Sequence, residues 1–432
     1  MTVDAAVIAE FARPESLELV YVGVIIADQD GGNGSERSRP SWKAHRLPVA
    51  AASIQDDGTA RLDIGNGALY HASQRGFGPL EIRPTDPFFL ENAVELLDEP
   101  GEWYFDDVTR KLYWWPPSAG ATGDAWIAVT ETLLNIDGTP DRTVRNISIE
   151  GIAFRHAGYT EPSESGYVVS QAAHWFTGWR ESDWMDFAGQ RHSYLDAERR
   201  PGQPGAAIRI DSARDITFTG DVFAELGAVG VLVQNDAKRI TFDSSIFVDI
   251  SAAALVAGHP VHDEIDEPME GPISDLRFTN NVVERAGAEF FASVGVQITK
   301  ADGVEISHNL FHDLPYSALS LGWGWENNPN STTHRAVAVN NNYFENVVNL
   351  LYDGAPIYLL GPVAEVGAPR RDFVQIRGNF INNLGADPQF KAPNDAIDPG
   401  FAKRPGIQID RGSRNILAVD NVFTGTTRWL QV

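Results

Sequence analysis

One short pattern recurs along the chain and limits what it can fold into. In residues 304–311 two apolar side chains, Val304 and Ile306, stand two positions apart. Counting Val304 as position 0, an asparagine follows at position 5 and a phenylalanine at position 7. The pattern fits eight stretches, whose position 0 residues are Ile147, Ile216, Ile240, Leu276, Val304, Val337, Val374 and Ile416. Repeats of a few tens of residues predict a solenoid in which each repeat forms one coil.

The residue types at these positions favour short strands. Isoleucine, valine and phenylalanine at period two suit β-structure, and position 7 is aromatic or branched in every repeat. Position 5 is asparagine in the last five repeats, and we expect each one to adopt the left-handed conformation and to hydrogen-bond its copy in the next coil. The sequence therefore predicts an all-β solenoid. The alternative is a β-sandwich with periodicity that arose by chance.

The pattern also divides the chain. Residues 1–125 do not follow it and are expected to form a β-rich N-terminal domain that abuts the solenoid or is inserted in it, whereas residues 126–432 form the solenoid. Apolar and aromatic runs at residues 16–27 and 102–117 predict strands in the first part. Loop insertions are expected at about 157–205 and 258–272. His259 and His262 in the second insertion lack zinc spacing, so we expect a solvated acidic loop there and no metal site.

The composition limits the kinds of molecule that the protein can bind. The chain has 34 basic and 59 acidic residues, a net charge of −25, which disfavours nucleic acid and makes a neutral polysaccharide easier to accommodate than a polyanion. It has no cysteine and no long uncharged apolar run, so we expect no thiol chemistry, no membrane span and no cofactor. The first residues do not resemble a signal peptide. We therefore expect a cytoplasmic protein if Met1 is native, and a secreted or periplasmic one if a leader was trimmed.

Position 9 of the repeat is a polar column. It contains Glu225, Asp249, Arg285, Asp313, Asn346 and Asn383. Coils stack about 4.8 Å apart, so Asp313 should lie between Arg285 and Asn346, which would hold its carboxylate ionised and oriented. The column could instead be only a ladder that caps the coils.

Asp353 follows Asp313 by one coil. Near these two carboxyls we expect four aromatic residues, Tyr316, Trp323, Trp325 and Tyr358. Two carboxyl groups flanked by aromatic rings are what glycoside hydrolysis needs: one acid to protonate the leaving oxygen, and one carboxylate to act as nucleophile or base. The alternative is that the Gly-Trp-Gly-Trp segment is a tight bend filled by core indoles.

Further residues are expected to bind the substrate. They are His312, Arg285, Asp249, and the first two residues of a tryptophan-rich loop, His174 and Trp175. That loop could form one wall of a cleft or be a plain packing flap. As a lone histidine, His312 could equally be a structural hydrogen-bonding residue.

Several segments resemble the right-handed parallel β-helix enzymes of glycoside hydrolase family 141. They are LLDEPGEWYFDDVTRKLYWWPP at 96–117, HNLFHDLPYSALSLGWGW at 308–325 and LLYDGAPIYLLG at 350–361. The family includes α-fucosidases and xylanases that act on plant cell-wall polysaccharides. The resemblance implies a right-handed parallel β-helix and a catalytic pair formed by Asp313 and Asp353.

Together these features predict a glycosidase that acts on a neutral plant-type or microbial polysaccharide. Asp313, beside Arg285, should ionise more readily, which favours Asp353 as the acid. Two alternatives stay open. A polysaccharide lyase or epimerase would use Arg285 to neutralise a uronate, and a non-catalytic carbohydrate-binding solenoid would tolerate loss of either aspartate.

Overall fold

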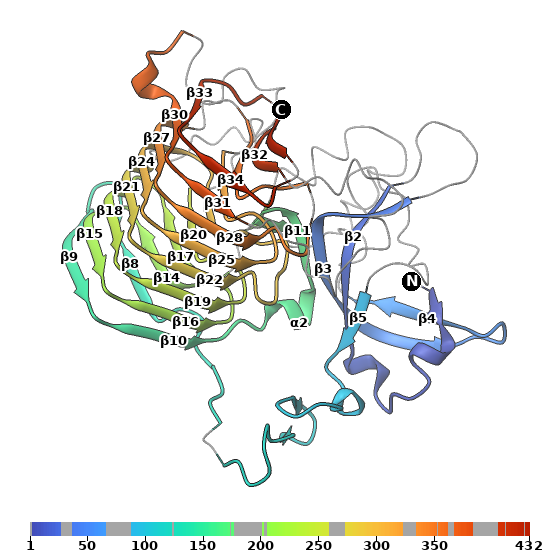
Figure 1. Cartoon of the computed structure of the whole chain (residues 1–432). Helices are drawn as coiled ribbons and strands as arrows, with labels where there is room; N and C mark the ends of the chain where they lie inside the picture. Colours follow the sequence, from blue (N-terminus) through green and yellow to red (C-terminus); the bar gives the residue numbers. More distant parts are fainter. Residues whose placement is uncertain are drawn as a thin grey trace.

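The chain folds into a parallel β-helix with an antiparallel sheet beside it (Figure 1). The structure, a computed structural model, describes residues 2–26, 37–65, 88–122, 125–172, 174–176, 201–202, 205–258, 273–322, 334–351, 353–361, 367–382, 405–410, 412–426 and 428–432. No helix in these ranges is long and apolar enough to cross a membrane. The solenoid prediction is confirmed, because three long parallel sheets run side by side along the described coils.

Each coil contributes one strand to each of the three sheets. The first sheet consists of β9 (Val144–Glu150), β15 (Ala213–Thr219), β18 (Lys238–Asp243), β21 (Ile273–Thr279), β24 (Ala301–Ser307), β27 (His334–Asn340), β30 (Val374–Arg377) and β33 (Ile416–Val419). The second sheet consists of β10 (Ala153–Ala157), β16 (Val222–Leu226), β19 (Ile246–Ile250), β22 (Val282–Ala286), β25 (Leu310–Leu314), β28 (Tyr343–Val347), β31 (Phe380–Asn382) and β34 (Val422–Thr424).

The third sheet closes the coil. It consists of β8 (Leu134–Asp137), β14 (Ala206–Asp211), β17 (Val229–Gln234), β20 (Leu255–Ala257), β23 (Val296–Ile298), β26 (Leu319–Leu321), β29 (Ile357–Leu359), β32 (Pro405–Ile409) and β35 (Arg428–Gln431). The chain passes from the first sheet to the second and then to the third before it starts the next coil.

The repeat predicts the strand register at every coil. The position 0 residues pair in one unbroken series, from Ile147 with Ile216 to Val374 with Ile416. The position 7 residues pair in the same way along the second sheet, from Phe154 to Phe423. Their side chains point inward and fill the core, where adjacent rings stack, as Phe223 does on Phe247 with centroids 4.3 Å apart.

The asparagine prediction is half right. The ladder asparagines from Asn281 to Asn379 each bond to their copy in the next coil, for example Asn309 Nδ2 to Asn342 Oδ1 at 2.9 Å. The left-handed residue, however, is the one before it, such as His308 with φ of 59° and Asn341 with φ of 56°. This residue turns the chain between the first and second sheets. The asparagine that follows is buried, and its amide bonds to the backbone of the preceding coil, as Asn342 does to Ile306 O.

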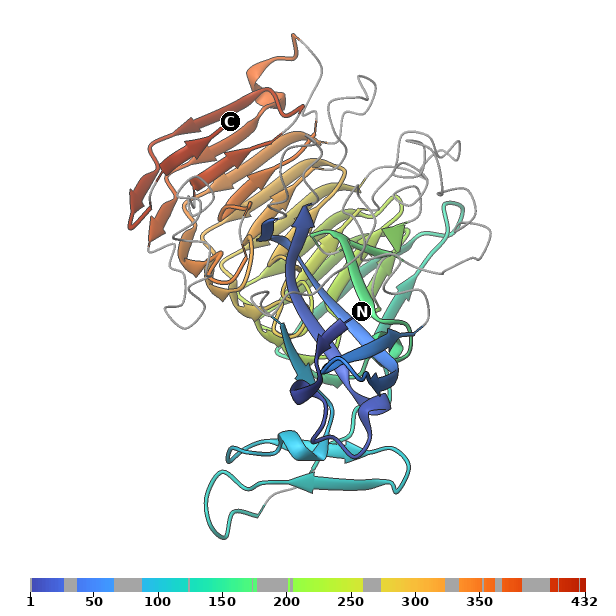
Figure 2. The same cartoon turned by 90° about the vertical axis from the view of Figure 1, so that its right-hand side faces the viewer.

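The N-terminal part forms a second, antiparallel sheet. It contains β1 (Thr2–Asp4), β2 (Glu18–Ile26), β3 (Arg37–Ile54), β4 (Thr59–Ile64) and β5 (Phe88–Glu91), joined by β11 (Tyr167–Gln171), β12 (His174–Phe176) and β13 (Pro201–Gly202). The last three strands come from the first loop insertion, and β11 pairs with β3. Figure 2 shows this sheet lying along one side of the solenoid. Residues 177–200 and 259–272, with His259 and His262, lie outside the described ranges.

The remaining elements are short. An isolated hairpin formed by β6 (Trp103–Asp106) and β7 (Lys111–Trp114) extends away from the solenoid in Figure 2. The helical turns are η1 (Ala5–Val7), η2 (Pro14–Ser16), η3 (Val94–Leu96), η4 (Arg370–Asp372) and α2 (Glu161–Ser165). The hairpin and β2 confirm the two strand-forming runs expected in the first 125 residues.

Candidate active site

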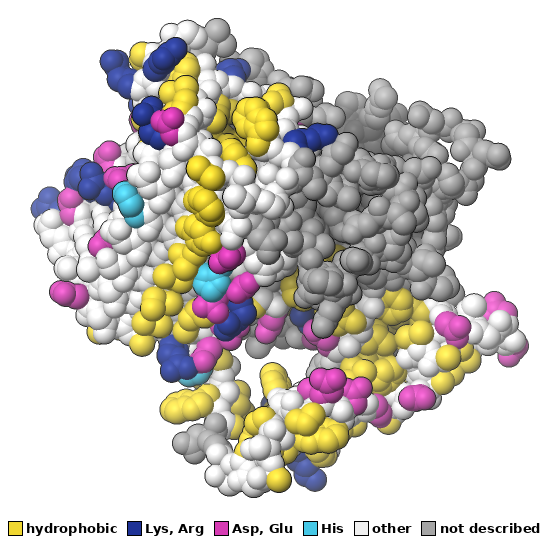
Figure 3. All heavy atoms as spheres, in the orientation of Figure 1, with side chains coloured by type: hydrophobic (Ala, Val, Ile, Leu, Met, Phe, Trp, Pro, Cys, Tyr) yellow, Lys and Arg dark blue, Asp and Glu magenta, His cyan; other side chains and the backbone are white. Residues whose placement is uncertain are grey.

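The polar column at position 9 exists, and its backbone is left-handed. Glu225, Asp249, Arg285, Asp313 and Asn346 have φ between 49° and 56°. A left-handed residue interrupts the strict alternation of a strand, so the side chains at positions 8 and 9 both leave the core. Along the face of the second sheet, Figure 3 shows a cluster of acidic, basic and histidine side chains beside a stripe of hydrophobic ones.

Asp313 is held by its neighbours in the column. Its Oδ1 accepts a hydrogen bond from Asn346 Nδ2 at 2.6 Å, and its Oδ2 lies 3.0 Å from His312 Nδ1. Partial burial would raise the pKa of the Asp313 carboxyl, but the bonds from Asn346 and His312 and the positive charge of Arg285 outweigh burial and lower the pKa. With 47% of its side chain exposed, Asp313 is an oriented carboxylate that solvent can reach.

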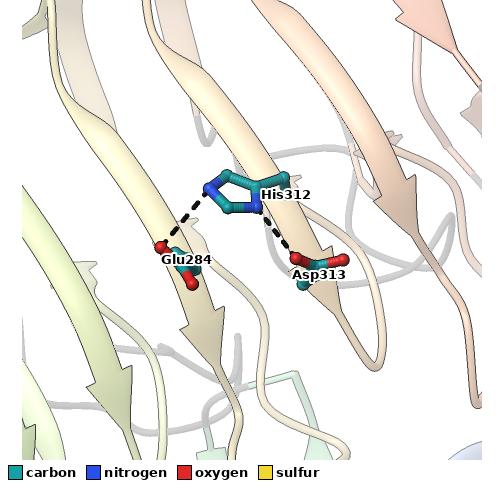
Figure 4. Close-up of side chains that lie close together, drawn as sticks. All are labelled: Glu284, His312 and Asp313. Atoms are coloured by element: carbon teal, nitrogen blue, oxygen red, sulfur yellow. Dashed lines mark hydrogen bonds and ion pairs between the residues drawn. The ribbon is translucent and has the colours of Figure 1, made fainter.

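His312 lies between two carboxylates (Figure 4). Its Nδ1 faces Asp313, and its Nε2 lies 3.5 Å from Oε2 of Glu284, the register neighbour in β22. Arg285 donates to Glu284 at 2.7 Å rather than to Asp313. The side chains of Glu284, His312 and Asp313 offer ligand atoms within 4.8 Å of one another, so they could hold a cation. The hydrogen bond between His312 and Asp313 and the ion pair between His312 and Glu284 also account for this arrangement of side chains.

Asp353 occupies a different environment, in the turn that leads from β28 into β29. Gln408 Nε2 donates to its Oδ1 at 2.9 Å, and the Tyr316 hydroxyl donates to its backbone oxygen at 2.8 Å. Burial raises the pKa of the Asp353 carboxyl, the Gln408 bond opposes this, and the negative charge of Asp410 adds to the rise. Within the described chain Oδ2 of Asp353 accepts no hydrogen bond, so it is the oxygen that can carry a proton.

The turn around Asp353 fits tightly over the preceding coil. Gly354 follows directly, and a Cβ placed on it would lie 2.5 Å from Cε2 of Tyr316 and 2.7 Å from Oγ of Ser317. The Ser317 hydroxyl oxygen also accepts a hydrogen bond from Ala355 N at 3.2 Å. Only glycine leaves room for the phenol of Tyr316 beneath the turn, so this packing fixes where the Asp353 backbone lies.

Asp313 and Asp353 belong to adjacent coils but to different parts of them. Asp313 is the last residue but one of β25 in the second sheet, whereas Asp353 lies one coil later, in the turn before β29 of the third sheet. The short turn after β25 lies between them, and its residue Tyr316 reaches the backbone of Asp353. The two carboxyls have separate hydrogen-bond partners, and no hydrogen bond in the described chain joins them directly.

The other predicted residues are distributed as follows. Tyr316 and Tyr358 are buried, with 2% and 4% exposure, so they present their hydroxyl groups rather than their ring faces. Asp249 is exposed, two coils before Asp313. His174 and Trp175 are in β12 of the antiparallel sheet. Trp323 and Trp325 lie outside the described residues.

Three polar residues near the carboxyls were not foreseen: Glu284, Gln408 and Asp410. Gln408 stands beside Tyr358 in the register of the third sheet, and Tyr358 donates a hydrogen bond of 2.6 Å to Asp410 Oδ2. The alternation in residues 407–410, apolar then polar, is a strand signal that the preceding proline- and aspartate-rich segment obscures. Glu284 precedes Arg285 in the repeat, but strict alternation would have separated the two side chains.

Comparison with known proteins agrees with these features. Residues 81–117 match a sequence model described as the GH141 insertion domain. A solved structure titled "Glycoside hydrolase" superposes with a TM-score of 0.75 at 23% identity, covering 99% of this chain and 72% of the other. No protein in the curated set gives a significant match.

Two further solved structures are much less similar. An alginate lyase from Paenibacillus sp. str. FPU-7 has a TM-score of 0.34 at 11% identity, covering 53% of this chain and 75% of the other. A family 28 exopolygalacturonase of Yersinia enterocolitica has a TM-score of 0.25 at 12% identity, covering 69% and 61%. Neither bears on the chemistry of the site. The chain therefore carries a segment similar to the GH141 insertion domain and shares its parallel β-helix fold with the solved structure titled "Glycoside hydrolase".

Proposed function

We propose that the protein cleaves a neutral plant-type or microbial polysaccharide, with Asp353 as the general acid and Asp313 as the nucleophile or base. The observation that carries the proposal is the contrast between two carboxyls on adjacent coils. Glycoside hydrolysis needs one carboxyl protonated and the other ionised at the same pH.

The surroundings of Asp313 suit the ionised role. Asn346 and His312 bond to both of its oxygens and lower the pKa of the carboxyl, and about half of the side chain is open to solvent. A carboxylate fixed in this way can attack a sugar carbon or orient a water molecule. His312, held by Glu284 on its other side, restricts the rotation of Asp313.

The surroundings of Asp353 suit the acid role. Burial and the charge of Asp410 raise the pKa of its carboxyl, and Gln408 occupies only one of its oxygens. The other oxygen can carry the proton that a leaving glycosidic oxygen requires.

The charge of the chain supports a neutral substrate. A net charge of −25 repels polyuronates. Arg285, whose positive charge acts on Asp313, is already paired with Glu284 at 2.7 Å. A uronate carboxylate would have to compete with that pair for the guanidinium.

The test is sugar release from a panel of neutral and acidic polysaccharides by the wild type, Asp313→Asn and Asp353→Asn. We expect both variants to lose about 10³-fold or more in kcat/KM on the best neutral substrate. Asp420→Asn is the matched control, because Asp420 has φ of 57°, close to the 55° of Asp313, and directly follows β33 of the first sheet.

Thermal unfolding of each variant verifies that it is folded. Activity retained in folded Asp313→Asn and Asp353→Asn would refute the catalytic pair. Unsaturated products that appear only from uronates would replace hydrolysis by a lyase reaction. Binding of glycans with no product from any polymer would make the protein a carbohydrate-binding solenoid.

A further inference from the structure

The outer face of the third sheet changes from apolar to polar near Asp353. In each strand of this sheet, the side chain between two core residues points away from the core. These outward residues pair in register, one per coil, in the series Leu232, Val256, Gln297, Ser320, Tyr358 and Gln408. The last four, here called the amide row, carry hydrogen-bonding groups, and each is at most 4% exposed.

The two glutamines at the ends of the amide row have polar atoms without a partner. Gln297 is fully buried, and neither its Nε2 nor its Oε1 makes a hydrogen bond in the described part of the chain. Gln408 Nε2 donates to Asp353 Oδ1 at 2.9 Å, but Gln408 Oε1 is unpartnered there as well. An unpaired buried polar group lowers stability, and native proteins rarely keep one unless a ligand or a bound water molecule meets it.

The unpartnered atoms select the chemistry of a ligand. Gln297 offers two N–H donors and one acceptor, and Gln408 offers a further acceptor. A hydroxyl group can donate and accept, whereas a carboxylate only accepts and would leave both amide oxygens unpaired. An ion would also lose its hydration in a buried row. These groups therefore match the hydroxyls of an uncharged sugar.

The amide row leads to the proposed acid. Gln408 lies three coils beyond Gln297, so the row is about 14 Å long when each coil rises roughly 4.8 Å. That length exceeds a single sugar ring, so the row fits a chain of sugars. Gln408 contacts the carboxyl of Asp353, which is only partly buried, so the row faces solvent at that end.

We propose that the amide row binds a neutral sugar chain, and that Gln297 determines specificity by bonding to hydroxyls of a sugar remote from the cleaved bond. The inference rests on the proposed cleavage of a neutral polysaccharide and adds the face along which the chain lies. The bound chain extends from Asp353 toward Gln297. Gln408 has two roles, because its Nε2 holds Asp353 and its Oε1 accepts from a sugar hydroxyl.

The first experiment measures KM and kcat of Gln297→Met on the best neutral polysaccharide. Methionine has nearly the shape of glutamine but no amide, so we expect KM to rise about tenfold while kcat changes by less than about twofold. Gln375→Met makes the same exchange on the outer face of β30 in the first sheet and should change neither constant. An unchanged KM in folded Gln297→Met, or an equal rise in Gln375→Met, would overturn the proposal.

The melting temperature separates a ligand site from a structural role. If the Gln297 amide is unpaired in the free protein, methionine relieves that burden, and Gln297→Met should melt about 1–3 °C higher than the wild type. If the amide bonds to a buried water molecule instead, the variant should melt lower and bind sugar as the wild type does, which contradicts the proposal.

Ser320→Ala is a smaller change in the same row and keeps the test decisive should Gln297→Met not fold. Loss of one hydroxyl should raise KM about threefold. A KM equal to that of the wild type in Ser320→Ala would then count against the amide row.

Binding is measured without cleavage in the Asp313→Asn background. The probes for titration calorimetry are hexasaccharides of xylan, glucan and mannan, with hexagalacturonate as the charged counterpart. Affinity for a neutral hexasaccharide that falls about tenfold when Gln297→Met is added supports the amide row even if no polysaccharide is cleaved. Equal affinity with and without the amide, a preference for hexagalacturonate, or no binding of any neutral hexasaccharide refutes it even if the enzyme is an active glycosidase.

Discussion

At the scale of single residues, the site is a set of carboxyls that differ in what surrounds them. Asp313 receives hydrogen bonds on both oxygens in an open position, and Asp353 receives one in a partly buried position. The same environments that separate the pKa values of the two groups also couple each of them to folding, because a pKa that differs between the folded and unfolded states makes stability depend on pH.

This coupling predicts opposite effects of two substitutions on the melting temperature. The folded pKa of Asp353 is raised, so the wild type loses stability as pH rises through the unfolded pKa toward the folded one. Asp353→Asn should therefore melt higher than the wild type near pH 7, and the difference should vanish below about pH 3, where both states are protonated.

For Asp313 the sign is reversed. Its folded pKa is lowered, so its contribution to stability is present above the unfolded pKa and disappears as pH falls through the folded one. Asp313→Asn should melt lower than the wild type near pH 7. Melting curves at several pH values test both substitutions, and a common direction of change would contradict the environments assigned to the two groups.

At the scale of elements, the asparagine ladder ties successive coils together where the first sheet turns into the second. Asn342 is 1% exposed. Its Nδ2 donates to Ile306 O at 2.9 Å and to Asn379 Oδ1 at 3.0 Å, while its Oδ1 accepts from Asn309 N and Nδ2. These buried polar groups have no other partners within the described coils, so each bond matters for the stability of the turn.

Removing one interior member should therefore be costly. Asn342→Ala should lower the free energy of unfolding by roughly 2–4 kcal/mol, because it deletes the bonds of one side chain and leaves donors of Asn309 unpaired in the core. Asn421, the last member of the ladder in the described chain, is only partly buried and bonds to fewer coils. Asn421→Ala should cost less than half as much in the same denaturant titration. Equal losses would mean that the ladder does not act through its interior bonds.

At the scale of the whole molecule, the N-terminal sheet packs on the corner of the solenoid that carries the site. One apolar cluster joins Val22 and Ala44 of that sheet to Tyr316 and Leu351 of the solenoid. Nearby, Arg46 in β3 pairs with Glu18 at 2.9 Å and with Glu91, and its guanidinium lies 5.9 Å from the ring centre of Phe290. Support for Tyr316 therefore comes partly from the N-terminal sheet.

Arg46 should stabilise the N-terminal sheet, because its ion pairs with Glu18 and Glu91 join three strands of that sheet. Arg46→Met leaves the carboxylate of Glu18, which is 7% exposed, without its partner, and should destabilise the N-terminal sheet by about 3–5 kcal/mol. The N-terminal sheet should then become sensitive to limited proteolysis before the solenoid does. Adding Glu18→Gln removes the unpaired charge and should recover part of the loss. If the double variant is as sensitive as the single one, packing rather than charge pairing dominates the stability of the N-terminal sheet.

The repeat by itself determined the solenoid, its strand register and its polar column. Inward positions recur at fixed offsets, and in a parallel β-helix an offset translates directly into a neighbour on the next coil, as in the series from Ile147 to Ile416. It also indicated that Asn346 lies next to Asp313, and their hydrogen bond confirms this. Whether Asp313 and Asp353 act as the catalytic pair is still a prediction.

Only the tertiary structure decided which side chains surround Asp313 and Asp353. Left-handed residues at position 9 break the alternation on which sequence-based assignment of side-chain direction depends, so Glu284 joins His312 and Arg285 turns away from Asp313. Gln408 in β32 reaches Asp353 across a segment of more than fifty residues, from a coil whose strands are short and widely spaced. A contact between coils that are far apart in sequence depends on loop lengths and packing, and these do not follow from the periodicity of any single repeat.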